Sequence, residues 1–137
     1  MVSPVFVDTS ALIALLDRAD PRHEAVSATF MDLADRELVT HGYVVAETLA
    51  VARRRFGVDG VVALLDDLLP VIAVLPVEPA LHASAQTKYR ASLPSGTSFV
   101  DQVSFEVIAR EAIETAFALD PDFLNAGVAV VPGSGPV

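Results

Sequence analysis

Residues 5–12 have the sequence VFVDTSAL, in which three apolar residues are followed by an acid and then by an amphipathic run. The apolar residues predict a short buried strand, and the run after them predicts a helix with one apolar stripe. Asp8 stands at the end of this strand. Ligands of open α/β sheets bind outside the carboxyl ends of the strands, so the stretch predicts both a fold class and the edge that carries the chemistry.

The rest of the chain repeats this alternation of apolar runs and amphipathic runs. Continuous apolar strands that alternate with helices are typical of a parallel sheet covered on both faces. We therefore expect one α/β domain over residues 1–131, followed by a flexible tail over residues 132–137, which are rich in glycine and proline. The expected strands are 5–7, 38–40, 71–75, 115–119 and 128–131, and the expected helices are 9–18, 22–35, 43–56, 58–69, 79–91 and 98–112.

The composition excludes several classes of protein. Without cysteine, the chain has no disulfide framework and no thiolate nucleophile. Its net charge of −9, with Lys88 as the single lysine, means that nucleic acid would be bound only through metal ions and local arginines. The apolar run 68–77 is too short to cross a membrane and no signal peptide is apparent, so we expect a soluble, cytoplasmic protein.

Four acids interrupt apolar patterns along the chain, and each has an alternative structural interpretation. Asp8 suits the N-cap of the helix that follows it, and Glu47 suits an exposed position on a mostly buried helix. Asp101 completes a capping-box pattern that starts at Ser98, and Asp120 suits a turn before proline. Taken one at a time, these positions leave the structural and the functional interpretation open.

Together the four acids are more informative. At about 4 Å and an effective dielectric of about 20, two like charges repel by about 4 kcal/mol, so a gathered set must bind protons or a cation. Hard oxygen ligands, in the absence of cysteine and of paired histidines, favour Mg²⁺ or Mn²⁺. Such an ion lowers the pKa of a bound water and neutralises charge on a phosphodiester. We therefore expect a divalent metal site, in which Asp122 could share the role of Asp120.

Four segments carry this pattern: residues 6–12 (FVDTSAL), 45–47 (VAE), 98–101 (SFVD) and 116–123 (AFALDPDF). In combination they resemble the PIN-domain nucleases, and most closely the VapC-type toxins of bacterial toxin–antitoxin pairs, over nearly the whole chain. The resemblance implies a PIN-like three-layer α/β fold, with a five-stranded parallel sheet of order 3-2-1-4-5 flanked by helices. It also implies a Mg²⁺- or Mn²⁺-dependent endoribonuclease, in which a metal-activated water attacks an RNA phosphodiester.

The resemblance assigns roles by position. It carries the catalytic and metal-binding acids over to Asp8, Glu47, Asp101 and Asp120, with Asp122 where members of the family vary. Thr9 or Ser10 matches a hydroxyl residue that supports the site and the substrate. The implied partners are RNA, an antitoxin whose tail occupies the groove, and a second copy of the chain in a homodimer. The chain departs from the family pattern in its acidity and at Gln102, where many members have a small residue.

Other features leave two interpretations open. The basic run 53–55 suits a helix C-terminus, although Arg54, two turns from Glu47, would also be able to contact phosphate. Tyr43 suits either packing or stacking on a base. The histidines at positions 23, 41 and 82 match no ligand spacing, and we expect them at the surface or half-buried.

Three other functions are alternatives to the nuclease. A non-catalytic PIN-like binding module with a degraded site is disfavoured by the complete set of four acids. A haloacid-dehalogenase-like phosphatase needs an acid where Ser10 stands. A receiver domain needs a lysine after a late strand, and the single lysine is Lys88.

Overall fold

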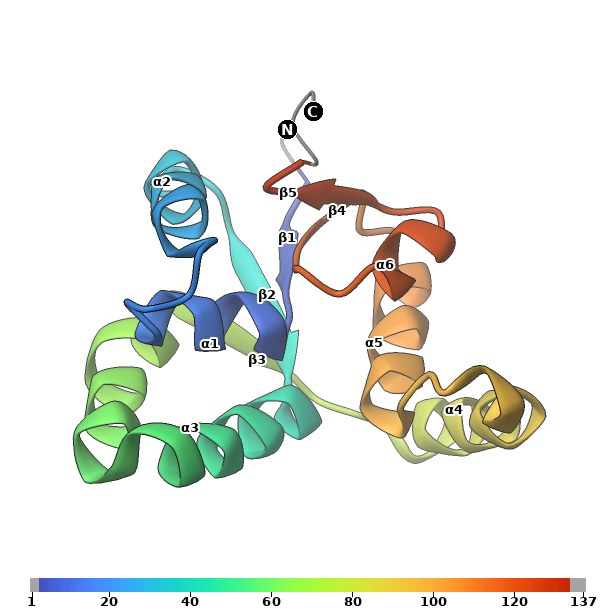
Figure 1. Ribbon diagram of the computed structural model, residues 1–137. Helices are drawn as coiled ribbons and strands as arrows, with labels where there is room; N and C mark the ends of the chain where they lie inside the picture. The colour runs from blue at the N-terminus through green and yellow to red at the C-terminus, as the bar shows by residue number, and fades with distance from the viewer. Residues whose placement is uncertain (1–2, 134–137) are drawn as a thin grey trace.

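The computed structural model describes residues 3–133, which form a central sheet with helices on both sides (Figure 1). The sheet has five strands in the order β3-β2-β1-β4-β5, and every neighbouring pair is parallel. This confirms the expected fold class and strand order. The strands are β1 (Val5–Val7), β2 (Leu38–His41), β3 (Ile72–Leu75), β4 (Thr115–Phe117) and β5 (Ala129–Val131).

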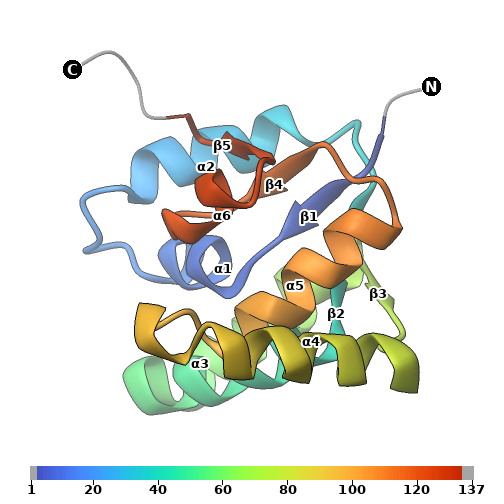
Figure 2. The same cartoon turned by 90° about the vertical axis from the view of Figure 1, so that its right-hand side faces the viewer.

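The helices follow from the strand order. The chain builds outward from β1 in one direction to β3, and then from β1 in the other direction to β5, and right-handed crossovers place the two sets of helices on opposite faces. Figures 1 and 2 show α1, α2 and α3 on one side, and α5 with α4 and α6 on the other. Their bounds are α1 (Thr9–Leu16), α2 (His23–Asp32), α3 (Gly42–Ala63), α4 (Pro79–Ala91), α5 (Phe99–Arg110) and α6 (Asp122–Asn125).

The central strand β1 is enclosed on both faces, with Val5, Phe6 and Val7 at most 1% exposed. Phe6 packs against Phe123 with ring centroids 6.0 Å apart, so β1 is held directly to the segment that follows β4. Since the strand order reverses at β1, its carboxyl end is the switch point at which such sheets bind ligands.

The expected boundaries differ from the structure in a few places. The expected helices 43–56 and 58–69 are joined in α3, although Gly57 keeps a non-helical backbone (φ 70°, ψ −157°) at the expected break. A π-helical turn, η1 (Leu64–Leu68), and a 3₁₀ turn, η2 (Leu69–Val71), complete this segment. Two short elements were not among the expected helices: a 3₁₀ turn before α5, η3 (Leu93–Ser95), and the single helical turn α6.

Strand β4 ends at Phe117, two residues before the end expected from the apolar pattern. The amide of Ala118 still donates to the Val131 carbonyl (3.1 Å), but Leu119 donates to a side chain instead. Of the expected tail 132–137, residues 134–137 lie outside the described part of the chain. Within residues 3–133, no helix combines the length and the apolar character that a membrane span requires.

Candidate metal-binding active site

Two strand ends and two helices bring the acids to the carboxyl edge of the sheet. Asp8 follows β1 directly and Asp120 lies in the loop after β4, while Glu47 belongs to α3 and Asp101 to the first turn of α5. Because β1 and β4 are adjacent and parallel, their ends meet at the same edge. Acids that are far apart in the sequence therefore become neighbours in space.

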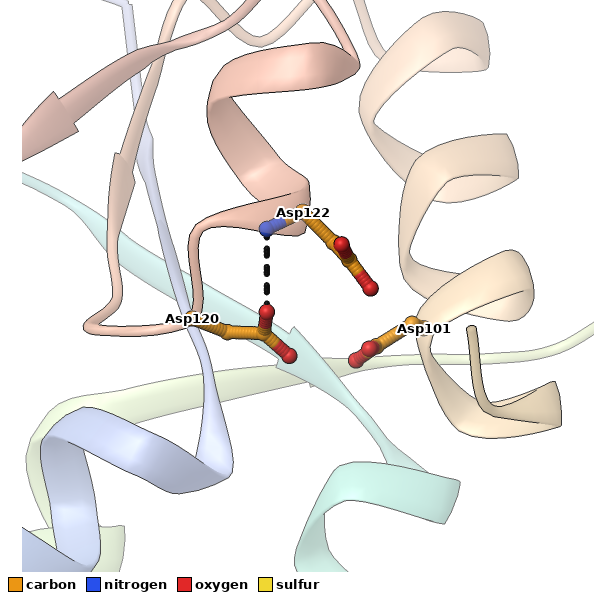
Figure 3. A group of neighbouring side chains, drawn as sticks. All are labelled: Asp101, Asp120 and Asp122. Carbon is orange, nitrogen blue, oxygen red and sulfur yellow. Dashed lines mark hydrogen bonds between the residues drawn. The ribbon is translucent and has the colours of Figure 1, made fainter. Parts of the chain in front are cut away.

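Three carboxylates form a tight group. One oxygen from each of Asp101, Asp120 and Asp122 lies within 4.8 Å of the other two. Figure 3 shows the Asp101 side chain reaching from α5 toward the loop that carries Asp120 and the first residue of α6, Asp122. The amide of Asp122 donates to Asp120 Oδ1 (2.9 Å), and the Thr97 hydroxyl donates to Asp122 Oδ2 (3.3 Å). These contacts orient two of the three carboxylates.

Asp8 caps α1, so its structural interpretation is confirmed. Its Oδ2 accepts hydrogen bonds from the Ser10 amide (3.1 Å) and the Ser10 hydroxyl (2.6 Å). Both hydrogen bonds found for this carboxylate within residues 3–133 fall on Oδ2, which leaves Oδ1 for another ligand. Burial raises the pKa of Asp8, the two Ser10 hydrogen bonds oppose this effect, and the charges of Asp120 and Glu47 add to it.

Asp101 also has a raised pKa. Burial raises its pKa to about 8, and the charge of Asp8, a hydrogen bond with Asp120 and the charges of Asp120 and Glu47 act in the same direction. Every one of these influences disfavours the carboxylate. In the absence of a cation, Asp101 therefore keeps a proton near neutral pH, and a bound cation would replace that proton.

Glu47 lies outside the tight group of three, but its charge acts on both Asp8 and Asp101. It is half-buried on α3 and lines a hollow of about 490 Å³ together with side chains from α4 and α5. Glu47 therefore links the group of three carboxylates, on which its charge acts, with the hollow that it lines.

The hydroxyls next to Asp8 are engaged within the chain. Ser10 Oγ donates to Asp8 Oδ2 and accepts from the Leu119 amide (2.8 Å), so it joins the end of β1 to the loop after β4. The Thr9 hydroxyl is buried and lies 2.9 Å from that of Thr48 on α3. These bonds position the acids, while a contact of either hydroxyl with substrate stays a prediction.

His41 is a residue whose role the sequence analysis missed. Contrary to the expected surface or half-buried position, its side chain is fully buried. Its Nδ1 accepts from the amides of Tyr43 (3.2 Å) and Val44 (3.4 Å) and so caps α3, and its Nε2 lies 2.9 Å from Ser104 Oγ on α5. Burial lowers the pKa of His41 to about 4, so the neutral ring donates through Nε2 and joins the helix of Glu47 to the helix of Asp101. Its position between a strand and Gly42 was the available signal, but histidine is not among the preferred N-cap residues.

The basic run divides into members with different surroundings. Arg55 pairs with Asp17 (2.7 Å) and its guanidinium lies 5.0 Å from the ring centre of Phe56. Arg54 is exposed on α3, and its contact with phosphate stays a prediction.

Comparison with known sequences indicates the protein family of the chain. The PIN domain family model matches residues 5–129. The 23S rRNA-specific endonuclease VapC20 of Mycobacterium tuberculosis is 32% identical over 124 residues, which cover 90% of this chain and 94% of that protein. Ribonuclease VapC26 of the same organism is 45% identical over 64 residues, and this match spans only 47% of each protein.

Solved structures agree with the sequence matches. The crystal structure of VapC20, described as a toxin that cleaves the sarcin–ricin loop, has a TM-score of 0.83 and 31% identity, and the match covers 91% of this chain and 96% of that chain. FitAcB of Neisseria gonorrhoeae has a TM-score of 0.69 at 19% identity, over 92% of this chain and 95% of that chain, and so supports the fold alone.

Proposed function

The chain belongs to the PIN-domain family and resembles its VapC-type toxins along most of its length, and on that premise we propose that it is a metal-dependent endoribonuclease and the toxin of a toxin–antitoxin pair. The observation that carries the proposal is the position of Asp101. It is a buried carboxyl that meets other carboxyls at the switch point of the sheet. A site of this kind suits an external cation, and a cation beside a groove suits phosphodiester hydrolysis.

The donor set fits a hard divalent ion. Asp101, Asp120 and Asp122 offer carboxylate oxygens close enough to share one ion, and oxygen ligands favour Mg²⁺ or Mn²⁺. Asp8 Oδ1 and Glu47 are the further candidates for ligands. When bound, such an ion lowers the pKa of a coordinated water and neutralises charge on the phosphate.

The side chains of this chain have distinct parts in the proposed reaction. The three clustered aspartates would hold the ion, and its binding would displace the proton of Asp101 to solvent. Asp8 and Glu47 add negative charge that strengthens cation binding and orients water. Ser10 and His41 position these acids through the hydrogen bonds described above.

The substrate that this assignment supports is RNA. A structured ribosomal loop is the first candidate, because VapC20 is described as cleaving the sarcin–ricin loop and its match covers almost the whole of both chains. Arg54 is a candidate for contact with the RNA backbone, which would oppose the repulsion expected from a net charge of −9. Thr9 and Ser10 would approach the substrate only at the rim of the acid group.

Partners and location extend the same proposal. A toxin implies a cognate antitoxin, and the group of carboxylates would favour a basic side chain on that partner. A homodimer and a cytoplasmic location, where RNA substrates are present, complete the proposed assignment.

The decisive experiment is a cleavage assay. The purified chain is incubated with 23S rRNA in Mn²⁺, in Mg²⁺ and in EDTA. We expect cleavage with either metal and none with EDTA, and we expect Asp120→Asn to lower the rate by about a hundredfold or more. Glu111→Gln is the matched control, because Glu111 is an exposed acid at the end of α5. This variant should cleave RNA like the wild type.

Two outcomes would contradict the proposal. If Asp120→Asn cleaves as fast as Glu111→Gln, the acid group is not the active site. If calorimetric titration shows Mn²⁺ binding but no RNA is cleaved, the chain is a binding module rather than an enzyme.

A further inference from the structure

A hollow of about 490 Å³ opens beside the acids, between α3, α4 and α5. Its size is within the range of pockets that hold small organic groups. The hollow shares Glu47 with the candidate active site, and Val100 in its wall directly precedes Asp101. Its lining residues are Tyr43, Ala46, Glu47, His82, Phe99 and Val100.

The aromatic residues of this wall are held in place by one another. The hydroxyl of Tyr43 lies 2.7 Å from His82 Nδ1, and these two rings meet edge to face with centroids 5.7 Å apart. The ring centroid of Phe99 lies 6.0 Å from that of Tyr43 and 5.3 Å from that of His82. Tyr89, which is not among the lining residues, contacts Phe99 edge to face at a centroid distance of 5.8 Å. The rings are only half-buried, so a preformed aromatic surface remains open to a ligand.

The chemistry of the wall favours a flat, uncharged group. Within residues 3–133, no lysine or arginine lines the hollow, so it does not suit a phosphate. Aromatic side chains stack on the faces of nucleobases irrespective of sequence. The carboxylate of Glu47 at the rim accepts hydrogen bonds, and the exocyclic amino groups of adenine and cytosine donate them.

We propose that this hollow holds a nucleobase of the RNA, next to the phosphate that is cleaved, stacked on Tyr43 and Phe99. This inference rests on the proposed function. The shared residue Glu47 links the two parts, because a base in the hollow leaves its backbone at the acid group. The hollow therefore places the phosphate, and its shape selects which base can occupy it.

The test uses a hairpin RNA with the sequence of the 23S rRNA sarcin–ricin loop. 2-Aminopurine replaces one adenine at a time, and binding to the full chain is followed in Ca²⁺ by fluorescence quenching and by anisotropy. Stacking on an aromatic ring quenches 2-aminopurine, so we expect strong quenching at one position of the loop. Cleavage of the same hairpin is measured separately in Mn²⁺.

Two variants change the hollow in different ways. Tyr43→Leu removes the ring, and Ala46→Leu fills the space from an exposed position without removing any packing contact. We expect each to weaken binding by about tenfold or more and to abolish the quenching. Tyr43→Phe keeps the ring and should recover most of the affinity. Met31→Ala is the control, because Met31 is an apolar side chain, 71% exposed, on α2, a helix that contributes no residue to the lining of the hollow given above.

The outcomes separate this inference from the proposed function. If Tyr43→Leu and Ala46→Leu bind the hairpin and quench 2-aminopurine as the wild type does, the base subsite is overturned, although the proposed nuclease activity is not. If Tyr43→Leu and Ala46→Leu sediment as monomers where the wild type is a dimer, and still bind RNA like the wild type, the base subsite is overturned and a second copy of the chain occupies the hollow. Quenching by the wild type without cleavage supports the subsite and contradicts the nuclease. Failure of the wild type to bind the hairpin contradicts both.

Discussion

Two carboxyl side chains on α5, Asp101 and Glu106, are almost equally buried, at 8% and 5% exposed, and have opposite surroundings. Glu106 forms salt bridges with Lys88 and with Arg110 (3.5 Å), and it accepts a hydrogen bond from Ser84 (3.2 Å). Burial alone would raise its pKa, but the contacts with Lys88, Ser84 and Arg110 hold the pKa below its usual value. Asp101 meets carboxyls instead, and its pKa is raised to about 8.

The difference separates a buried acid that the fold compensates from one that it does not. A buried carboxylate is tolerated when cations and donors compensate the lost hydration, and α4 supplies them to Glu106. At Asp101 the fold supplies further negative charge, which costs stability unless a cation arrives from outside. The same helix therefore contains one acid whose charge is compensated by its neighbours and one that, under the proposed function, a bound cation would compensate.

The largest expected effect is on metal affinity. Asp101→Asn removes a carboxylate from the group of three and should weaken Mn²⁺ binding by about a hundredfold or more in calorimetric titration. Glu106→Gln should leave Mn²⁺ affinity within about threefold, because its oxygens are bonded to α4 and to Arg110. Equal losses in the two variants would remove the distinction between the sites.

The two sites should also respond to pH with opposite signs. The pKa of Asp101 rises from 3.8 to about 8 on folding, so its contribution to stability is complete below pH 3.8 and is lost as the pH rises toward 8. The pKa of Glu106 falls below 4.5, so its contribution is present above that pH and is lost in acid. In EDTA, the thermal midpoint should therefore decrease as the pH rises from 5 to 8.

A bound metal ion should reverse the loss of stability that accompanies rising pH. Mn²⁺ at about one hundred times its Kd stabilises the folded state by about 2.7 kcal/mol, which corresponds to a rise of about 10 °C in the thermal midpoint. The rise should grow with pH, because the ion competes with the proton of Asp101. The assignment would be contradicted if the thermal midpoint of the wild type in EDTA were independent of pH. It would also be contradicted if the midpoint of Asp101→Asn depended on pH in the same way as that of the wild type.

A smaller effect is expected on stability at the compensated site. Glu106→Gln should lower the free energy of unfolding by about 1–2 kcal/mol, because a charged hydrogen-bond acceptor is lost while Lys88 and Arg110 remain partly exposed to solvent. Urea unfolding in EDTA measures this loss, with Glu111→Gln as the control on the same helix. In the same assay Asp101→Asn should be neutral or stabilising, and a larger loss there than at Glu106 would reverse the comparison.

The smallest expected effect concerns Ser104, which lies between the two acids on α5. Ser104→Ala leaves the Nε2–H of buried His41 without its acceptor, which should cost about 1 kcal/mol in urea unfolding. Because this bond joins the helix of Glu47 to that of Asp101, RNA cleavage should also fall a few-fold. Unchanged cleavage together with lowered stability would limit the bond to a structural role.

The sequence predicted the elements of the fold because their patterns are local. An apolar strand followed by an acid marks the end of β1, and Gly57 marks the break in α3. The order of the strands came from the family resemblance, since apolar patterns do not state which strands are neighbours. The last two residues predicted for β4 are apolar but lie beyond the end of the strand. The Ala118 amide still donates to Val131 of β5, whereas the Leu119 amide donates to the Ser10 side chain, which the apolar pattern does not indicate.

The candidate site was predictable only in part. Acids at strand ends were apparent, but the close approach of Asp122 to Asp101 depends on the turn α6, which directs its side chain back toward α5. The roles of His41 and Glu106 depend on partners from other elements. For Glu106, sequence spacing indicates only Arg110 at i+4, whereas Lys88 and Ser84 come from α4.

The Ser10 hydroxyl uses both of its hydrogen-bonding capacities, one toward Asp8 and one toward the Leu119 amide. This hydroxyl therefore extends the contact between the two chain segments beyond the last paired residues of β1 and β4, Val7 and Phe117, to the residues that follow both strands. An exchange to alanine would remove the hydroxyl bond to Asp8 and the acceptor of the Leu119 amide, so the loop that carries Asp120 would lose one of its links to the end of β1 while the backbone pairing of β1 with β4 remains. Natural variation at position 10 should accordingly be confined to serine and threonine.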